Sequence, residues 1–466
     1  MTVQIKDDQA TEGGAAGVLA DVRRVFNSGR TRSLTWRSEQ LHAVERMCQE
    51  REPEIAEALA SDLGRSSFEA WLGDIGSTQA EAAFARKHLK KWVKPKRYGL
   101  PLAQLPGRAW VQYDPLGVIL VIGPWNYPFY LCMAPVVAAI AAGNGMVIKP
   151  SELAPATSAL IARLVPEYLD SEAIRVVEGD ASVTQDLLAQ GFDHALFTGG
   201  SEIGRKIMAA AAPTLTPVTL ELGGKSPVVV LADADLDVAA RRIAWIKMLN
   251  SGQTCIAPDY VLADRTIAAQ LADKIVATIA QFRAEEKDPS LRIVNERQFD
   301  RLAALIGATS GTVVTGGGSD RAALRIEPTV IVDPPADDPS MSDEIFGPIL
   351  PILSVDSPDE AVAFVNARPK PLALYVFTAS QQAARDLVDR MPSGGAVVNH
   401  VAVHCLVPQL PFGGVGASGM GAYHGKWGFE TLSHRRAVLA KSTKLDLKLM
   451  YPPYTDRAIR LIRKAF

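Results

Sequence analysis

The sequence has few cysteines, little net charge and no long uninterrupted apolar run. Its 4 cysteines in 466 residues are too few for a disulfide framework, so free thiols in a reducing compartment are the simpler interpretation. The 49 basic residues nearly balance 51 acidic ones. Because no basic block is present, a nucleic-acid partner is not expected.

Membrane and secretory features are also scarce. The longest apolar run, at 129–142, is interrupted by Pro135 and is shorter than the ~18 residues that suggest a membrane span. The first residues, MTVQIKDDQATEGGAAG, contain acidic side chains and no apolar segment, unlike a secretory signal. We therefore expect a cytoplasmic protein without an integral membrane segment, and a frayed leader at this end.

The chain is too long for one ordinary hydrophobic core, so two or three domains are expected. Residues 17–92 have helical composition and apolar spacing, whereas the proline-rich residues 90–110 predict an extended connection. From 118 onwards, short apolar runs alternate with helical patterns. Strands are predicted at 118–122, 146–148, 174–177, 194–197 and 218–222. Helices are predicted up to 142, at 155–169, at 182–190 with Ser182 as N-cap, and at 202–212.

This alternation predicts an α/β fold with a doubly wound parallel sheet. A second strand–helix region extends from 224 to about 421. It has a predicted helix at 236–250, ended by Asn250 and Gly252, and strands at 349–355, 372–377 and 396–398.

Polar residues follow the first set of strands, at the edge where such sheets bind ligands. Asn126 is an amide donor suited to an oxyanion, or part of a plain turn. Lys149 and Glu152 are suited to ribose contacts, or form a solvated ion pair. The turn TGGSEIG, at 198–204, is suited to phosphate, although it is not a GxGxxG motif. Glu221 is a surface or capping carboxylate, or a general base with a raised pKa.

Cys255 lies in NSGQTCIAPDY, at 250–260, among small and polar residues. It is either a nucleophile or a small core residue near a turn. One predicted strand and one predicted helix separate it from Glu221. We therefore expect Cys255 to fold back over the polar edge of the first sheet.

Seven motifs together resemble the aldehyde dehydrogenase superfamily, in that family's order. They are PWNYP (124–128), KPSE (149–152), the FTGG–IG turn (197–204), ELGGK (221–225), GQTC (252–255), EIFGP (344–348) and PFGGVGASGMG (411–421). Three further stretches are most similar to class 3, the branch of fatty and aromatic aldehyde enzymes. They are NSGQTCIAPDYVL, GMGAYHGKWGFETLSHRR (419–436) and YPPY (451–454).

The resemblance implies a domain organisation and an assembly. It assigns 17–96 and 114–223 to an NAD(P)-binding domain, 224–424 to a catalytic domain, 97–113 and 425–445 to an oligomerisation and bridging segment, and 446–466 to a tail. It also implies a homodimer. The tail residues 455–466 alternate basic and apolar side chains at helical spacing. They predict a helix on the dimer, a loose end, or contact with a membrane surface.

The same resemblance implies a role for each matching residue. Cys255 corresponds to the nucleophile, Glu221 to the general base and Asn126 to the side-chain oxyanion donor. The corresponding cofactor contacts are Trp125, Lys149, Glu152, Gly199, Gly200, Ser201, Glu202, Ile203, Gly204, Leu222, Gly223, Glu344 and Phe346. The implied substrate channel includes Tyr130, Trp245 and His404. NAD is the expected cofactor, NADP is also possible, and no metal ion is expected.

The implied reaction oxidises a medium- or long-chain aliphatic aldehyde, or an aromatic one, to its acid through a cysteine thioester. Some local lowering of the Cys255 pKa is expected to help. Two alternatives remain: a CoA-acylating enzyme on the same fold, which Glu221 disfavours, and a cofactor-independent cysteine hydrolase. The hydrolase requires a base, and His194, His400 and His404 match no catalytic position of the family. Among the other cysteines, Cys48 and Cys132 are predicted core thiols, and Cys405 borders the substrate mouth.

Overall fold

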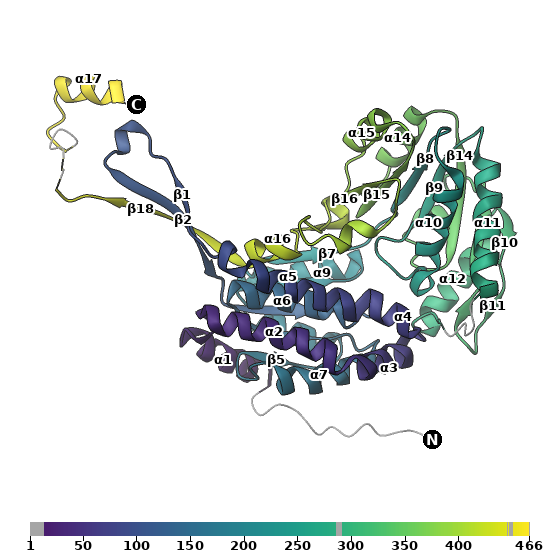
Figure 1. The fold of residues 1–466 in the computed structure, drawn as a ribbon, viewed down its shortest axis with the longest axis horizontal. Helices are drawn as coiled ribbons and strands as arrows, with labels where there is room; N and C mark the ends of the chain where they lie inside the picture. Colours follow the sequence, from purple (N-terminus) through teal and green to yellow (C-terminus); the bar gives the residue numbers. More distant parts are fainter. Residues whose placement is uncertain (1–13, 286–290, 445, 447–450, 466) are drawn as a thin grey trace.

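The protein, in a computed structural model, consists of two large, mostly parallel sheets with their helices and a projecting arm (Figure 1). The structure describes residues 14–285, 291–444, 446 and 451–465. Within these ranges the strands form a six-stranded, a seven-stranded, a three-stranded and a two-stranded sheet, the last from β11 (Ser319–Asp320) and β12 (Arg325–Ile326).

The first large sheet has the order β17-β7-β6-β3-β4-β5. Its five parallel strands are β3 (Val118–Ile122), β4 (Gly145–Lys149), β5 (Ile174–Val176), β6 (His194–Thr198) and β7 (Val218–Glu221). β17 (Gly419–Met420) pairs antiparallel with β7 at the edge. All residues of β3, β4 and β6 are buried, as expected of strands covered on both faces. The predicted α/β fold class is confirmed.

Helices cover both faces of this sheet. The helices of this region are α1 (Gly14–Asn27), α2 (Leu34–Glu50), α3 (Glu52–Leu63), α4 (Ser67–Ala70), α5 (Gly76–Trp92), α6 (Tyr130–Ala142), α7 (Pro155–Tyr168), α8 (Ala181–Ala189) and α9 (Ser201–Ala211). Of these, α1, α8 and α9 share a core with Val118 and Leu120 of β3, whereas α2, α5, α6 and α7 share one with Ile119 and Val121. A π-helix, η2 (Trp71–Ile75), lies between α4 and α5. The predicted N-cap of α8 is wrong. Asp180 caps this helix, since its side chain accepts from the Ser182 backbone N–H at 2.8 Å.

The second large sheet has the order β10-β13-β14-β9-β8-β15-β16. Its strands are β8 (Pro227–Val230), β9 (Tyr260–Asp264), β10 (Thr312–Thr315), β13 (Thr329–Val332), β14 (Ile349–Val355), β15 (Ala373–Phe377) and β16 (Gly395–Val398). Only β10 runs antiparallel among them. Its helices are α10 (Leu236–Met248), α11 (Ala268–Glu285), α12 (Glu296–Ala308), α13 (Pro339–Ser342), α14 (Pro358–Asn366) and α15 (Gln381–Arg390). The predicted helix at 236–250 therefore ends two residues early, at Met248.

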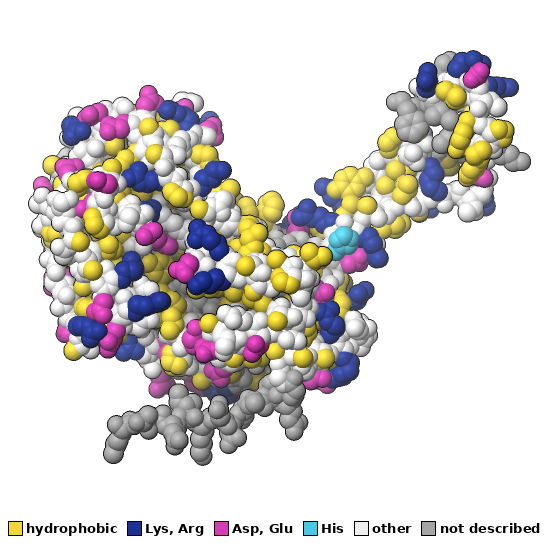
Figure 2. Space-filling view, turned by 180° about the vertical axis from the view of Figure 1, so that it is seen from behind, with side chains coloured by type: hydrophobic (Ala, Val, Ile, Leu, Met, Phe, Trp, Pro, Cys, Tyr) yellow, Lys and Arg dark blue, Asp and Glu magenta, His cyan; other side chains and the backbone are white. Residues whose placement is uncertain are grey.

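The arm is an antiparallel sheet that projects from the body (Figure 1). It consists of β1 (Lys96–Tyr98), β2 (Gly107–Pro115) and β18 (Ser433–Lys441), with Gly107 paired to Lys441 and Pro115 to Ser433. Apolar side chains gather along it (Figure 2). Four of these are at least half exposed: Tyr98, Leu102, Leu105 and Leu439.

The last predicted helix corresponds to α17 (Asp456–Ala465), which lies beyond the arm (Figure 1). Residues 447–450 of the predicted tail, and residue 466, lie outside the described residues. Among those that are described, no helix is both long and apolar enough to cross a membrane.

Two short elements bear on the predicted domain boundaries, which stay a prediction. β17 belongs to the predicted catalytic domain but pairs with the edge of the first sheet. The helix α16 (Gly425–Thr431), in the predicted bridging segment, packs on α6. A Cβ at its Gly428 would lie 2.8 Å from the Ala138 side chain, so the two helices approach closely.

Candidate active site

The Cys255 loop begins where α10 ends. The 3-10 turn η5 (Leu249–Gly252) contains Asn250 and Ser251 with φ values of +50° and +52°. Gly252 has a φ of +68°, and a Cβ there would lie 2.3 Å from the Gly347 carbonyl oxygen. Only glycine fits this position without strain. The kink stops the helix and directs the next residues into a cavity.

That cavity has an empty volume of about 890 Å³ and is partly open to solvent. Thr198, Glu221 and Leu222 reach it from the edge of the first sheet, and Cys255 reaches it from the loop after α10. The structure therefore brings the two predicted reacting groups into one cavity, as the chain order suggested. The remaining lining is mostly apolar, and includes Leu72, Tyr130, Leu131, Trp245, Ile246, Leu249, Ile256, Leu372, Leu406, Phe412 and Tyr423.

Burial dominates the electrostatics of both groups. The Glu221 side chain is 3% exposed, and neither carboxyl oxygen has a hydrogen-bond partner among the described residues. Burial raises the pKa of Glu221 well above its usual value. Burial also raises the pKa of the Cys255 thiol, with smaller contributions from Glu344, Cys405 and Glu221. The local lowering of the thiol pKa that would help the reaction is not found in this arrangement, because the surroundings are apolar and the nearby charges are acidic.

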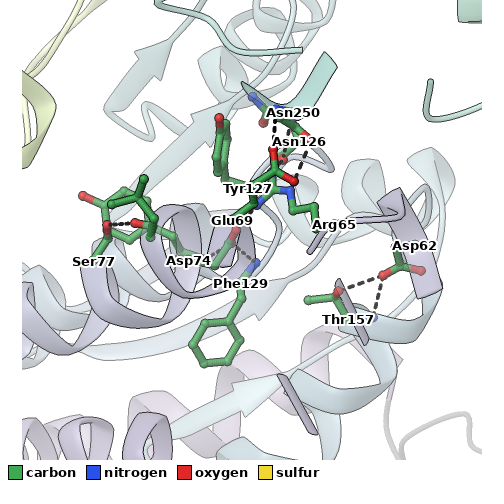
Figure 3. Close-up of polar contacts among 12 residues, drawn as sticks. Asp62, Arg65, Glu69, Asp74, Ser77, Asn126, Tyr127, Phe129, Thr157 and Asn250 are labelled. Carbon is green, nitrogen blue, oxygen red and sulfur yellow. Dashed lines mark hydrogen bonds and ion pairs between the residues drawn. The ribbon is translucent and has the colours of Figure 1, made fainter. Parts of the chain in front are cut away.

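Asn126 is linked to the Cys255 loop by hydrogen bonds. Its side-chain Nδ2 donates to the Gln253 carbonyl at 3.1 Å. Its own backbone carbonyl accepts from Asn250 Nδ2 at 3.0 Å and from the Arg65 guanidinium (Figure 3). The next residue, Tyr127, bonds Thr254 through their hydroxyls at 2.8 Å. The loops that carry Asn126 and Cys255 therefore form one hydrogen-bonded unit.

Lys149 and Glu152 are paired with each other. The Lys149 ammonium lies 2.5 Å from a Glu152 carboxylate oxygen, and the lysine is buried whereas the glutamate is largely exposed. An ion pair is thus present, but it differs from the solvated pair of the alternative because its lysine is buried. Because this ion pair lies at the carboxyl end of β4, its groups remain beside the edge of the first sheet.

The predicted phosphate turn connects β6 to α9. Gly199 and Gly200 precede the first residue of the helix, Ser201, and a Cβ on Gly200 would meet nothing within 4 Å. Within the helix, a Cβ on Gly204 would lie 2.7 Å from the Leu222 side chain, so Leu222 packs against this turn. The helix side chains that follow Ser201 lie at the surface: Glu202 pairs with Lys206 and Ile203 is 46% exposed.

Glu344 and Phe346 belong to the region of the second sheet, and they contact residues at the edge of the first sheet. A Cβ on Gly223 would lie 1.9 Å from a Glu344 carboxyl oxygen, so these residues are in close contact. Burial, followed by the charge of Asp259, raises the pKa of Glu344 to about 8. The Phe346 ring meets the Trp125 ring edge to face, with centroids 5.3 Å apart.

The three predicted channel residues separate into two groups. Tyr130 and Trp245 line the cavity. His404 does not belong to the lining, although its neighbours Val403 and Cys405 do. The His404 ring packs beside Phe412, with centroids 5.7 Å apart, and burial lowers its pKa to about 4. Cys405 thus borders the cavity, whereas Cys48 and Cys132 are fully buried core thiols, as predicted.

Several lining residues were missed by the sequence reasoning. Leu72 and Gly73 come from the π-helix η2, which carries no motif. His424 also lines the cavity, and its Nδ1 lies 3.2 Å from the Tyr130 hydroxyl and 3.4 Å from a Glu81 carboxylate oxygen. His424 lies in GMGAYHG, part of a stretch that resembles class 3 enzymes. That resemblance is the only sequence feature that pointed to this residue.

The fold and the cavity define the class of this protein. A doubly wound sheet presents a glycine turn, a lysine and two carboxylates at one edge, beside an apolar cavity that holds a cysteine. A doubly wound sheet with such an edge is the architecture of α/β dehydrogenases that bind a dinucleotide.

Comparisons with known proteins specify the family. The model of the aldehyde dehydrogenase family matches residues 3–438, so the chain belongs to this family of oxidoreductases. It is 46% identical over 456 residues to aldehyde dehydrogenase family 3 member H1 of Arabidopsis thaliana, covering 96% of this chain and 94% of that one. It is also 46% identical to the dimeric NADP-preferring aldehyde dehydrogenase of Rattus norvegicus, covering 92% and 96%. The predicted likeness to class 3 is therefore confirmed.

A solved structure agrees with this assignment. The substrate-bound state of Staphylococcus aureus AldH superimposes with a TM-score of 0.93 at 40% sequence identity, covering 96% of this chain and 98% of that one. The aldehyde dehydrogenase fold predicted from the motifs is thereby confirmed.

Proposed function

We propose that the protein oxidises a medium- or long-chain aliphatic aldehyde, or an aromatic one, to its carboxylic acid with NAD⁺ or NADP⁺. The observation that carries this proposal is the shared cavity of Cys255 and Glu221. A thiol and a carboxyl group face one apolar space beside a sheet edge suited to a dinucleotide, and the carboxyl oxygens have no hydrogen-bond partner among the described residues.

The residues of the sheet edge fit a nicotinamide dinucleotide. The open space at Gly200 lets a phosphate approach the backbone N–H groups at the start of α9. When bound, the cofactor supplies the hydride acceptor. The residues proposed to hold it are Lys149 and Glu152 at the adenosine ribose, 199–204 at the pyrophosphate, and Trp125, Leu222, Gly223, Glu344 and Phe346 around the nicotinamide end.

Cys255 is proposed to attack the aldehyde carbon as a thiolate, forming a tetrahedral thiohemiacetal. The negative oxygen of this adduct requires hydrogen-bond donors. An amide NH₂ group has two N–H bonds, and Asn126 uses one of them on the Gln253 carbonyl. Its second N–H, together with the backbone N–H of Cys255, is proposed to stabilise the oxyanion.

Glu221 is proposed to activate the water that hydrolyses the resulting thioester. A carboxyl group with a raised pKa is a stronger base than an exposed glutamate, so it takes a proton from water more readily once ionised. The absence of a hydrogen-bond partner among the described residues leaves its oxygens free to bind that water.

A panel of aldehydes tests the proposed function. Because the cavity lining is apolar, kcat/KM is expected to rise with aliphatic chain length by up to about 4-fold per buried methylene. Benzaldehyde is expected to react as well. NAD⁺ is expected to give a higher kcat/KM than NADP⁺, because the Glu152 carboxylate repels a 2′-phosphate. Reduced cofactor and carboxylic acid are measured together. Failure of every aldehyde to yield reduced cofactor contradicts the proposal.

We also propose that the protein is a homodimer assembled through the arm. Four apolar side chains of the arm are at least half exposed, which is costly on a monomer surface. One relative is named as dimeric. Light scattering in solution is expected to give twice the 50.0 kDa chain mass. A 50.0 kDa species that persists at high protein concentration contradicts the dimer.

A further inference from the structure

A buried ion pair lies next to the Asn126 loop, the segment 123–129 that joins β3 to α6. Arg65 precedes α4, and Asp74 belongs to the π-helix η2 (Figure 3). Their side chains are 1% and 0% exposed. Two charges are expensive to bury, and a buried pair contributes little net stability compared with apolar residues of the same size. The contacts of this pair therefore point to a function other than stability.

Each donor of Arg65 contacts a different part of the site. One terminal nitrogen binds the Asp74 carboxylate, and the other binds the Asn126 backbone carbonyl. Its Nε donates to Asn250 Oδ1 at 3.1 Å. The guanidinium also stacks over the Tyr127 ring, with its carbon 4.2 Å from the ring centroid. A single arginine thus connects the Asn126 loop to the kink before Cys255.

Asp74 holds the other end of the Asn126 loop. Its Oδ1 accepts from the backbone N–H group of Phe129 at 3.1 Å (Figure 3) and from that of Tyr130 at 2.8 Å. The π-helix itself packs on this loop, since a Cβ at Gly73 would lie 2.8 Å from the Tyr127 ring. Short π-helical segments occur frequently at functional sites. The ion pair therefore forms hydrogen bonds to the backbone on both sides of Tyr127.

Asn250 completes the link to the nucleophile loop. Its Nδ2 donates to the carbonyls of both Asn126, at 3.0 Å, and Gln253, at 3.1 Å. The Gln253 carbonyl also accepts from the Asn126 side chain. The orientation of the Asn126 amide thus depends on a network that includes the buried pair of Arg65 and Asp74, and in which the Glu69 carboxylate accepts from the Asn250 backbone N–H at 3.3 Å.

We propose that Arg65 and Asp74 are positioning residues for the oxyanion donor Asn126. They fix the peptide of Asn126 relative to the Gln253 carbonyl, so that the second N–H of the amide faces the oxygen of a Cys255 adduct. This inference rests on the proposed function. It assigns part of the site's geometry to the N-terminal helices, which carry none of the family motifs. Misplacement of a reacting group by ~1 Å costs on the order of 10²-fold in rate.

The chain offers a matched control for Arg65. Arg37, in α2, is also buried and also donates to backbone carbonyls, those of Thr31 at 3.3 Å and Ala141 at 3.2 Å. It has no bond to the Asn126 or Cys255 loops among those that the structure records. Arg37→Lys therefore reports the general cost of shortening a buried arginine in this helical region.

A double-mutant cycle tests the proposal. Arg65→Lys and Arg37→Lys are each made in the native background and with Asn126→Ala, and kcat, KM for NAD⁺ and Tm are measured. We expect Arg65→Lys to lower kcat by about 10-fold or more in the native background and by less than ~2-fold with Asn126→Ala, because the donor it positions is then gone. The KM for NAD⁺ stays within ~2-fold. Arg37→Lys is expected to lower Tm with kcat within ~2-fold in both backgrounds.

An equal loss of kcat in both backgrounds, or an unchanged kcat in Arg65→Lys, overturns the proposal. Should Arg65→Lys not fold, Asp74→Asn provides the same cycle, because its side-chain oxygen still accepts from Phe129 and Tyr130 while the charge is lost. The proposed function fails separately, if the unaltered protein forms no reduced cofactor with aldehydes. The native protein can instead oxidise aldehydes while Arg65→Lys lowers kcat by the same factor with and without Asn126→Ala. That result overturns only the positioning role.

Discussion

Cys255→Ala is expected to abolish aldehyde oxidation, lowering kcat/KM by at least ~10³-fold. Without the sulfur, no covalent adduct forms, and the aldehyde carbon remains trigonal and a poor hydride donor. The cavity offers no equivalent nucleophile at the same place. The steady-state rate of reduced-cofactor formation is measured with a medium-chain aldehyde, and the rate of the variant is compared with that of the unaltered protein.

Cys405→Ala is the matched control, because Cys405 lines the same cavity and has a similarly raised pKa, to about 12. It is expected to retain kcat within ~3-fold, since large-to-small changes at a partly exposed lining position are mild. Turnover by Cys255→Ala refutes the nucleophile assignment. A native protein that cleaves esters but binds no NAD⁺ favours the cysteine hydrolase instead.

Glu221→Gln is expected to separate the two halves of the reaction. Oxidation of the first aldehyde molecule does not need the base, so each site releases about one equivalent of reduced cofactor in a burst. Hydrolysis then becomes limiting, and steady-state kcat falls by about 10²- to 10⁴-fold. Rapid-mixing absorbance measures the burst, and mass spectrometry of the quenched protein detects the acyl group on Cys255.

The same glutamate sets an expected pH dependence. Burial raises the pKa of Glu221, so its carboxylate form, the base, is scarce at low pH and increases as the pH rises. The hydrolytic step is therefore expected to accelerate as the pH rises in the native protein, at pH values above those at which an exposed glutamate titrates. In Glu221→Gln this rise is lost, because the amide does not titrate. A pH profile that persists in the variant contradicts the base assignment.

Two controls make the burst interpretable. Glu221→Gln combined with Cys255→Ala is expected to show no burst, since no thioester forms. Added coenzyme A distinguishes the CoA-acylating alternative: a native protein that then makes acyl-CoA as its main product is not a hydrolytic enzyme. The carboxylic acid as main product, with and without coenzyme A, supports the role proposed for Glu221.

Local sequence patterns predicted the first sheet well, for a physical reason. Parallel strands buried on both faces read as continuous apolar runs, and the runs at 118–122 and 194–197 became β3 and β6. The polar residues after them could be placed at one edge because parallel strands end on the same side. Capping was harder: Asp180 and Ser182 are both good cap residues, and only the backbone geometry shows that Asp180 caps α8.

Properties that depend on distant parts of the chain were not predictable. The raised pKa of Cys255 results from apolar residues that many segments bring to the cavity. Leu72 and Gly73 reach it through the packing of η2, which no local pattern encodes. His404 was expected in the lining on the strength of its loop, but within that loop the side chains of Val403 and Cys405 line the cavity and His404 does not.

The arm and the first sheet each need a strand from near the C-terminal end of the chain, so neither can finish folding early during synthesis. β2 pairs with the nearby β1 on one side, but its other side pairs with β18, and a bond in the arm joins Gln104 to Lys441, 337 residues apart. The edge strand β7 likewise waits for β17. Domains generally fold from the N-terminal side as the chain emerges. Here the outer edges of β7 and β2 stay open until β17 and β18 have left the ribosome. Premature termination before β17 therefore leaves both edges exposed, and such edges favour aggregation.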